Sequence, residues 1–145
     1  MIKHKQIYRH LPKEGQIGDC ARTVIACLLD LHPLEVPHFA RDAIEAGNEQ
    51  DAVAAMDLWV RANGHTFVEF PVQASSTEDA LNWAGSYCKN TLYTLMGTSN
   101  NKVNHIVICL DREIYWDTSL DNSGIIAPSS DGYYWVGMLI KGMRP

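Results

Sequence analysis

The hydrophobic positions in the first half of the chain recur at helical spacing. Apolar residues line one side of a helix over residues 19–31, and Asp19 is a favourable N-cap residue at its start. A second helix is predicted over 49–62, where the pattern ends at Asn63-Gly64, a typical C-terminal cap. A third helix is predicted to open at Thr77, because acidic residues occupy the turn that follows it.

The second half of the chain changes to the patterns of β-strands. Strands are predicted at residues 66–70, 91–96, 103–110, 113–118 and 133–140. Because helices come before most of the strands, we expect an α+β fold, with N-terminal helices packed on an antiparallel sheet, and no alternating βαβ units. The length of 145 residues predicts a single domain over residues 1–145.

The charge balance argues against a nucleic-acid-binding protein. The formal net charge is -5, whereas nucleic-acid binding needs a basic patch or stripe. A local group of basic residues near the N-terminus is interpreted as a solvated arm: Lys3, His4, Lys5, Arg9 and His10.

No stretch approaches the roughly 20 apolar residues that span a bilayer, and the N-terminus lacks the apolar region of a signal peptide. We therefore expect a cytoplasmic protein with no nucleic-acid partner and no membrane partner.

The four cysteines, at positions 20, 27, 88 and 109, form no CxxC pair. In a reducing compartment they are expected to be free thiols. No two Cys or His residues have the tight spacing of a structural metal site, so neither a metal nor another cofactor is predicted. Cys27 lies within an apolar helix and Cys88 closes another, so both are interpreted as buried residues.

Cys20 differs from the other cysteines because it begins the first predicted helix. A thiol at a helix N-terminus experiences the positive end of the helix dipole, which favours the nucleophilic thiolate. Gly15 and Gly18 allow the backbone to approach a substrate, and amide groups at the helix start can form an oxyanion hole. The carboxylate of Asp19 opposes the thiolate unless it is used in capping. A small buried core cysteine is the alternative interpretation.

The predicted hairpin at 103–118 brings a histidine and an aspartate together. If its turn contains three residues, 110–112, His105 faces Asp117 across the two strands. The opposite face then carries an apolar set formed by Ile106, Ile108, Ile114 and Trp116. A two-residue turn would shift this register and separate the pair. A carboxylate beside an imidazole orients it and raises its basicity. A His–Asp surface pair or a half-buried histidine is the alternative.

These segments resemble those of small papain-like cysteine peptidases, including the type that cleaves bacteriocin leaders. Gly18-Asp19-Cys20 and the helix that follows look like the nucleophile helix of these enzymes. Residues 104–108 and 114–117 look like their His strand and Asp strand. The stretch 29–39 is similar to small uncharacterised proteins, many of them from bacteriophages.

The resemblance implies a papain-like fold in which Cys20 is the nucleophile, His105 the general base and acid, and Asp117 the group that orients the imidazole. Such enzymes have an oxyanion-stabilising glutamine a little upstream of the cysteine. Gln16 is closer to Cys20 than that pattern and Gln6 is farther, and Gln16 is the candidate.

Further substrate-binding candidates are Gly18, Asp19, Asn104 and Trp116. Asn104 could instead cap its loop, and Trp116 could be a core residue. The remaining histidines are expected at the surface or in turns: His4, His10, His32, His38 and His65.

The function expected from these features is that of a cysteine hydrolase acting on an amide, isopeptide or thioester bond of a protein or peptide substrate. If the chain is phage-encoded, it would act in the host cytoplasm. Two alternatives remain open. One is a transglutaminase-like acyl transferase, which uses the same groups. The other is a catalytically retired papain-like scaffold that acts as a binding or inhibitory protein, for example in phage counter-defence.

Overall fold

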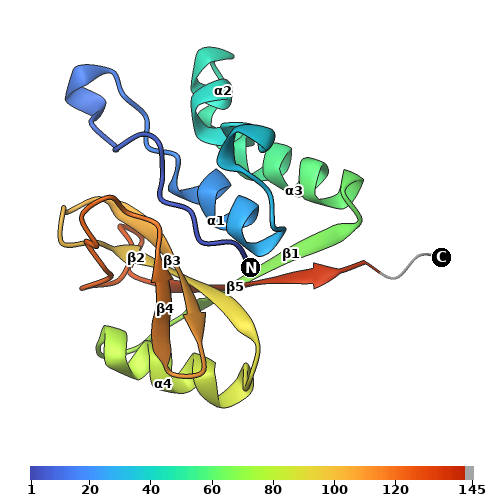
Figure 1. The fold of residues 1–145 in the computed structure, drawn as a ribbon. Helices are drawn as coiled ribbons and strands as arrows, with labels where there is room; N and C mark the ends of the chain where they lie inside the picture. The colour runs from blue at the N-terminus through green and yellow to red at the C-terminus, as the bar shows by residue number, and fades with distance from the viewer. Residues whose placement is uncertain (143–145) are drawn as a thin grey trace. The chain divides into compact units, whose positions relative to one another are not determined.

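The computed structural model describes residues 1–142 and has an α+β fold, as predicted (Figure 1). Its α-helices are α1 (Cys20–Leu28), α2 (Phe39–Glu45), α3 (Ala52–Ala62) and α4 (Thr77–Tyr87). Short 3-10 helices are η1 (Pro12–Glu14), η2 (Pro33–Glu35) and η3 (Glu49–Asp51). The strands are β1 (His65–Val72), β2 (Leu92–Thr98), β3 (Asn104–Leu110), β4 (Glu113–Asp117) and β5 (Tyr134–Lys141).

By its internal contacts the chain divides into two compact units. The N-terminal unit contains residues 1–68 and the end of the chain from Leu139. The central unit contains residues 69–138. Strands β1 and β5 each begin in one unit and end in the other. Cys20 therefore belongs to the N-terminal unit, whereas His105 and Asp117 belong to the central unit.

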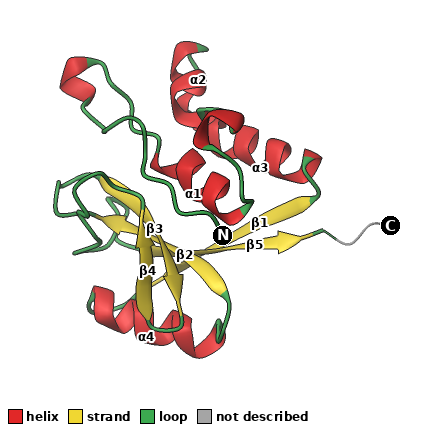
Figure 2. Ribbon diagram, in the orientation of Figure 1, coloured by secondary structure: helices red, strands yellow, loops and turns green. Residues whose placement is uncertain are grey.

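The N-terminal unit contains the α-helices α1, α2 and α3, drawn in red in Figure 2. It has its own hydrophobic core, to which all three contribute. The buried residues are Ile25 and Ala26 of α1, Phe39 of α2, Val60 of α3 and Val36 before α2. Phe67 of β1 and Leu139 of β5 pack against them. Burying each of the larger side chains among these stabilises the fold by about 1.5–3 kcal/mol, and this core fixes α1 and hence the backbone around Cys20.

Helix α2 is the α-helix that the sequence pattern does not predict. Pro33 and Pro37 indicate an interruption of regular structure, and the helix begins at Phe39, two residues after Pro37. Its N-cap is His38, whose side chain accepts a hydrogen bond from the backbone N–H of Arg41. Histidine is not among the residues that usually mark a helix start, so the local sequence offers no strong signal.

The central unit is a strand-rich layer with one helix. The strand order in the five-stranded sheet is β1-β5-β2-β3-β4, and the pairs β5–β2, β2–β3 and β3–β4 are antiparallel. Helix α4 packs on one face, where its buried residues Ala80 and Ala84 meet a core that includes Leu95, Val107 and Cys109. The absence of a side chain at Gly85 lets the turn between β3 and β4 lie against α4, because a Cβ at this position would lie 2.0 Å from the Asp111 carbonyl oxygen.

The N-terminal segment packs against residues of α1 and the turn after it. The interpretation of this segment as a solvated arm is therefore wrong for its backbone. The terminal amino group forms an ion pair with Asp30 at 3.1 Å, and the N–H of His4 donates to the Cys27 sulfur at 3.3 Å. Gln6 is buried. The side chains of Lys3, Arg9 and His10 are exposed, as expected.

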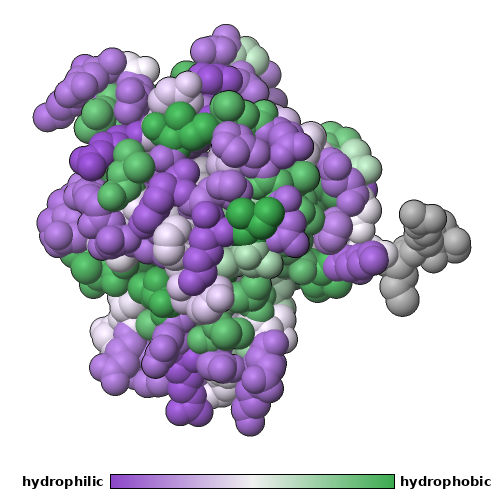
Figure 3. All heavy atoms as spheres, in the orientation of Figure 1, coloured by the Kyte–Doolittle hydropathy of each residue, from purple (hydrophilic) through white to green (hydrophobic). Residues whose placement is uncertain are grey.

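Within residues 1–142, no helix has the length and apolar character that crossing a bilayer requires. On the face shown in Figure 3, hydrophilic residues predominate and hydrophobic groups are scattered among them. Isolated surface hydrophobic residues of this kind are normal for globular proteins.

Candidate active-site residues

His105 and Asp117 form a close pair within the central unit. The Nε2 atom of His105 lies 2.7 Å from Oδ1 of Asp117, and the two side chains are 5% and 10% exposed. Two backbone amides also donate to this carboxylate, that of Ser119 to Oδ1 and that of Gly124 to Oδ2, each at 2.8 Å. The segment after β4 therefore folds back around Asp117 and encloses it.

These contacts determine the charge of Asp117. Burial alone would raise the pKa of the Asp117 carboxyl, but the hydrogen bonds from His105, Ser119 and Gly124 outweigh it and hold the pKa well below its ordinary range. The carboxylate is ionised at neutral pH and accepts the Nε2–H of His105. In a neutral imidazole with its proton on Nε2, Nδ1 is the basic nitrogen.

The predicted register of the hairpin is wrong, although the predicted pair forms. The turn contains two residues, since Leu110 pairs with Glu113. A β-bulge then shifts the register by one residue, so that Val107 is opposite Asp117. Val107 and His105 are two residues apart and share a face, which brings Asp117 to His105 along a diagonal.

The bulge also changes the predicted apolar face. Ile108 pairs with Trp116, whereas Ile114 pairs with Cys109. Ile114 therefore lies on the face that carries Cys109, where it packs against the α4 core. The predicted grouping of Ile114 with Ile108 and Trp116 is wrong, because the extra residue in β4 reverses the alternation between them.

Cys20 is the first residue of α1 and the most accessible cysteine of the chain. It is half-buried, whereas Cys27 and Cys109 are 0% exposed and Cys88 is 6% exposed. The interpretation of Cys27 and Cys88 as buried is confirmed. Burial raises the pKa of the thiols of Cys27, Cys88 and Cys109, which keeps them protonated at neutral pH.

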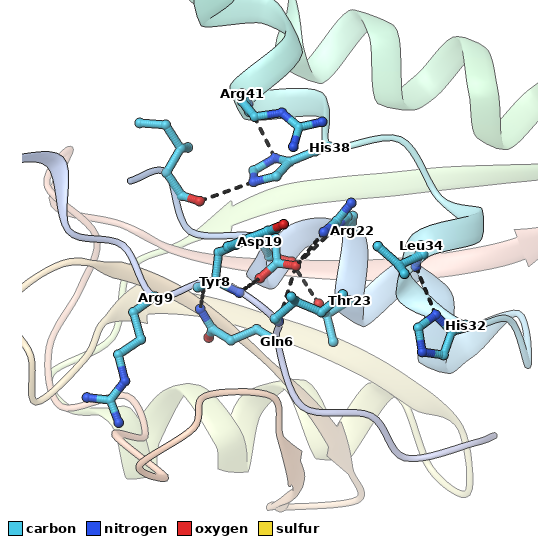
Figure 4. A network of polar contacts seen from close by, with 12 residues as sticks. Gln6, Tyr8, Arg9, Asp19, Arg22, Thr23, His32, Leu34, His38 and Arg41 are labelled. Atoms are coloured by element: carbon cyan, nitrogen blue, oxygen red, sulfur yellow. Dashed lines mark hydrogen bonds and ion pairs between the residues drawn. The ribbon is translucent and has the colours of Figure 1, made fainter. Parts of the chain in front are cut away.

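Asp19 occupies the N-cap position of α1, but its side chain does not cap the helix. The carboxylate is buried and accepts the N–H of Tyr8 at 2.9 Å and the N–H of Ile7 at 3.3 Å (Figure 4). The Arg22 guanidinium contributes a hydrogen bond from Nε and an ion pair from a terminal nitrogen, each at 2.9 Å. The expected capping role is wrong because these groups take up both carboxylate oxygens.

The backbone before Cys20 is packed tightly against the segment around His10. A Cβ at Gly18 would lie 2.8 Å from the His10 Cβ and 3.0 Å from its backbone nitrogen, so only glycine fits there. The N–H of Gly18 donates to Nδ1 of His10 at 3.3 Å. Gly15 adopts a left-handed conformation, with φ 73°, and closes the turn after η1.

The two glutamines considered for an oxyanion hole both bond to their own segment. The side-chain amide of Gln16 donates to the Arg9 carbonyl at 2.9 Å. The amide of Gln6, which is 7% exposed, donates to the Tyr8 carbonyl. Gln6 therefore belongs to the buried network around Asp19 (Figure 4), whereas the hydrogen bond of Gln16 is to the exposed Arg9.

The remaining substrate-binding candidates, Asn104 and Trp116, lie in the central unit. The amide group of Asn104 donates to the Ser130 hydroxyl and accepts the Ser130 N–H, each at 3.2 Å. Asn104 thus ties the start of β3 to a later loop. Trp116 is half-buried on β4.

His38 is a buried residue that the sequence interpretation placed at the surface or in a turn. Its side chain is 2% exposed and both ring nitrogens make hydrogen bonds. The prediction is wrong because the aromatic ring of Tyr8 and the start of α2 cover it. His32 and His65 agree with the turn interpretation, since His32 caps η2 and His65 contacts the Asn63 carbonyl.

Within residues 1–142, no group of three His, Cys, Asp or Glu side chains could hold a metal ion.

Each of the two units carries part of the predicted reactive set. The N-terminal unit contains Cys20, a half-buried cysteine at a helix start, and the central unit contains the buried His105–Asp117 pair. Comparison with protein-family models, curated proteins and solved structures found no match for this chain.

Proposed function

We propose that the protein is a cysteine hydrolase that cleaves an amide, isopeptide or thioester bond in a protein or peptide substrate. Cys20 is the nucleophile, His105 is the general base and acid, and Asp117 orients the His105 imidazole. The enzyme acts in the cytoplasm and uses no cofactor.

The observation that carries this proposal is the 2.7 Å contact between His105 and a carboxylate held by two backbone amides. A carboxylate fixed in this way keeps an imidazole in one tautomer and stabilises the imidazolium that forms during proton transfer. An ordinary His–Asp surface pair would be solvated, whereas this pair is largely buried. The half-buried Cys20 at the start of α1 supplies the nucleophile that such a pair serves.

In the proposed reaction, Nδ1 of His105 takes the proton of the Cys20 thiol, and the resulting thiolate attacks the carbonyl carbon of the scissile bond. The bond to the leaving group breaks, and the leaving amine or thiol takes a proton from the His105 imidazolium. Water then attacks the acyl group on Cys20 while His105 accepts its proton. The carbon–sulfur bond breaks, the acid is released, and the Cys20 sulfur recovers a proton from His105.

The test uses iodoacetamide as a probe of the thiol and a small activated thioester as an acyl donor. Labelling of Cys20 is followed by peptide mass spectrometry in the wild type, Cys20→Ser, His105→Ala and His65→Ala. The His65 variant is the control, because it removes an imidazole whose hydrogen bond is with the Asn63 carbonyl.

We expect a covalent acyl adduct on Cys20 in the wild type and none in a folded Cys20→Ser protein. Alkylation of Cys20 near pH 7 should slow by about tenfold or more in His105→Ala, because the His105 imidazole stabilises the reactive thiolate of Cys20. The rate should stay unchanged in His65→Ala. A folded His105→Ala protein with wild-type alkylation of Cys20 would contradict the mechanism. An adduct that transfers to an added amine in preference to water would indicate an acyl transferase instead.

A further inference from the structure

His38 links two segments of the N-terminal unit through both nitrogens of its ring. It is the N-cap residue of α2, and its Nδ1 accepts the backbone N–H of Arg41 at 3.3 Å. Its Nε2 lies 3.1 Å from the carbonyl oxygen of Ile17, at the end of the loop that leads into α1 (Figure 4). The side chain is 2% exposed, so water does not replace either partner.

This arrangement fixes the protonation state of the ring. An amide N–H can only donate, so Nδ1 must carry a lone pair. A carbonyl oxygen can only accept, so the ring proton is on Nε2. The neutral imidazole with this tautomer satisfies both contacts, whereas an imidazolium would direct an N–H at the Arg41 amide.

The peptide group that His38 contacts, that of the Ile17 carbonyl, lies shortly before Cys20 in the chain. Ile17 is followed by Gly18, which packs against His10, and by Asp19, which is held by Arg22. The carboxylate of Asp19 and the imidazole of His38 thus hold the backbone at two points directly before Cys20. The ordinary pKa of a histidine such as His38 lies near neutral pH.

We propose that His38 is a positioning residue for Cys20: the hydrogen bond from its neutral imidazole to the Ile17 carbonyl fixes the backbone that carries the nucleophile into α1. This proposal rests on the proposed function for the role of Cys20 as nucleophile. The hydrogen-bonded link itself is independent of any activity.

The surroundings of His38 make this link sensitive to acid. Burial is the main effect and lowers the pKa of His38, and the Ile17 carbonyl opposes it. The positive charges of Arg22 and Arg41 lower the pKa further, and the carboxylate of Asp19 raises it. The uncharged ring of Tyr8 stacks at 6.2 Å between centroids. The net pKa is lower than in the unfolded chain, so the unfolded chain takes up the proton first and stability falls as the pH drops below about 6.5.

Two substitutions separate the two contacts of the ring. In His38→Gln, the side-chain amide nitrogen can reach the position of Nε2 and donate to Ile17, and it does not titrate. In His38→Asn, the shorter side chain retains an acceptor for the Arg41 amide, as a good N-cap residue, but cannot reach Ile17. Hydrogen exchange of residues 16–20, corrected for intrinsic rates, reports the backbone before Cys20 without any substrate.

We expect the exchange of the wild type to rise between pH 7 and pH 5. His38→Gln should match the wild type at pH 7 and lack that rise. His38→Asn should exchange at least about fivefold faster at both pH values, because the lost bond stabilises by about 1 kcal/mol. Wild-type exchange in folded His38→Asn would overturn the proposal, as would an unchanged pH dependence in His38→Gln. If neither variant folds, ¹⁵N NMR of wild-type His38 decides, since a proton on Nδ1 at pH 7 would also overturn it.

Alkylation of Cys20 by iodoacetamide distinguishes this proposal from the proposed function. Faster exchange in His38→Asn with an unchanged rate of Cys20 alkylation would show that His38 does not position the thiol. A rate that depends on His38 but not on His105 would retain the positioning role and contradict the hydrolase mechanism.

Discussion

His105 and Asp117 lie on a diagonal of the β3–β4 pair, and they share one face of the sheet only because β4 contains an extra residue. Asp117 is opposite Val107, two positions along β3 from His105. Tyr115 is the extra residue of the bulge, since it lies between Ile114 and Trp116, which are opposite Cys109 and Ile108. Bulges commonly redirect a side chain in this way next to functional sites.

Removing the bulge should separate the pair. With Tyr115 deleted, the two-residue turn would place Asp117 on the opposite face of β4 from His105, because a shift of one residue reverses every side chain. We expect ¹⁵N NMR of His105 to show the loss of the hydrogen-bonded Nε2–H and the free energy of unfolding to fall by about 3 kcal/mol. The control is Tyr115→Ala, which retains the residue count at a 43% exposed position and should cost under about 1 kcal/mol. An intact His105–Asp117 bond in the deletion variant would show that the bulge does not determine the pairing.

Replacing Asp117 with asparagine should destabilise the protein in a manner that depends on pH. The amide side chain of Asp117→Asn would have one acceptor oxygen for three donors, and we expect a loss of about 3 kcal/mol at pH 7. The pKa of Asp117 is lower in the folded protein than in the unfolded chain, so its contribution is present above about pH 4 and is lost as the pH falls further. Urea denaturation between pH 7 and pH 3 should therefore show the two proteins converging in acid. A constant difference over that range would mean that the charge of Asp117 is not the source of the stability.

Several elements could be predicted from the sequence because local patterns determine them. The hydrophobic spacing after Cys20 and after Thr77 predicts α1 and α4, although α1 ends at Leu28, earlier than expected. The alternation along 103–110 predicts β3. These inferences need only neighbours along the chain. The sequence predicts the His105–Asp117 pair through a three-residue turn, whereas the pair forms through a two-residue turn and a bulge.

The parts that could not be predicted depend on contacts between distant residues. The bulge at Tyr115 has no marker in the sequence, such as a glycine. The register of the β3–β4 pair could therefore not be predicted from the alternation of apolar and polar residues. Asp19 is typical of an N-cap, but its carboxylate is taken by Arg22 and by amides of residues 7–8, which no local rule reveals. His38 looks like a turn residue until the backbone of Ile17 is seen beside it.

Replacing Asp19 with asparagine should release the N-terminal segment. The change would leave the buried Arg22 guanidinium without a charged partner, which costs about 3–5 kcal/mol in comparable buried pairs. The amides of Ile7 and Tyr8 donate to the same carboxylate, so their hydrogen exchange should accelerate more than that of residues in β3. The matched control is Asp57→Asn, which breaks the exposed 2.8 Å pair with Arg61 on α3 and should cost under about 0.5 kcal/mol. Equal effects of the two substitutions would mean that Asp19 does not anchor this segment.

The four cysteines should react with iodoacetamide in an order determined by their burial. Cys20 is half-buried, whereas Cys27, Cys88 and Cys109 are buried and their pKa values are raised by desolvation. At pH 7.5 we expect Cys20 to react at least about tenfold faster than each of the others, because alkylation requires an accessible thiolate. In 8 M urea the four rates should become similar, since the differences arise from the fold. Site-resolved mass spectrometry measures all four rates in one sample. A native Cys20 that reacts no faster than Cys109 would identify it as an inert structural thiol and would direct the search for function toward binding partners.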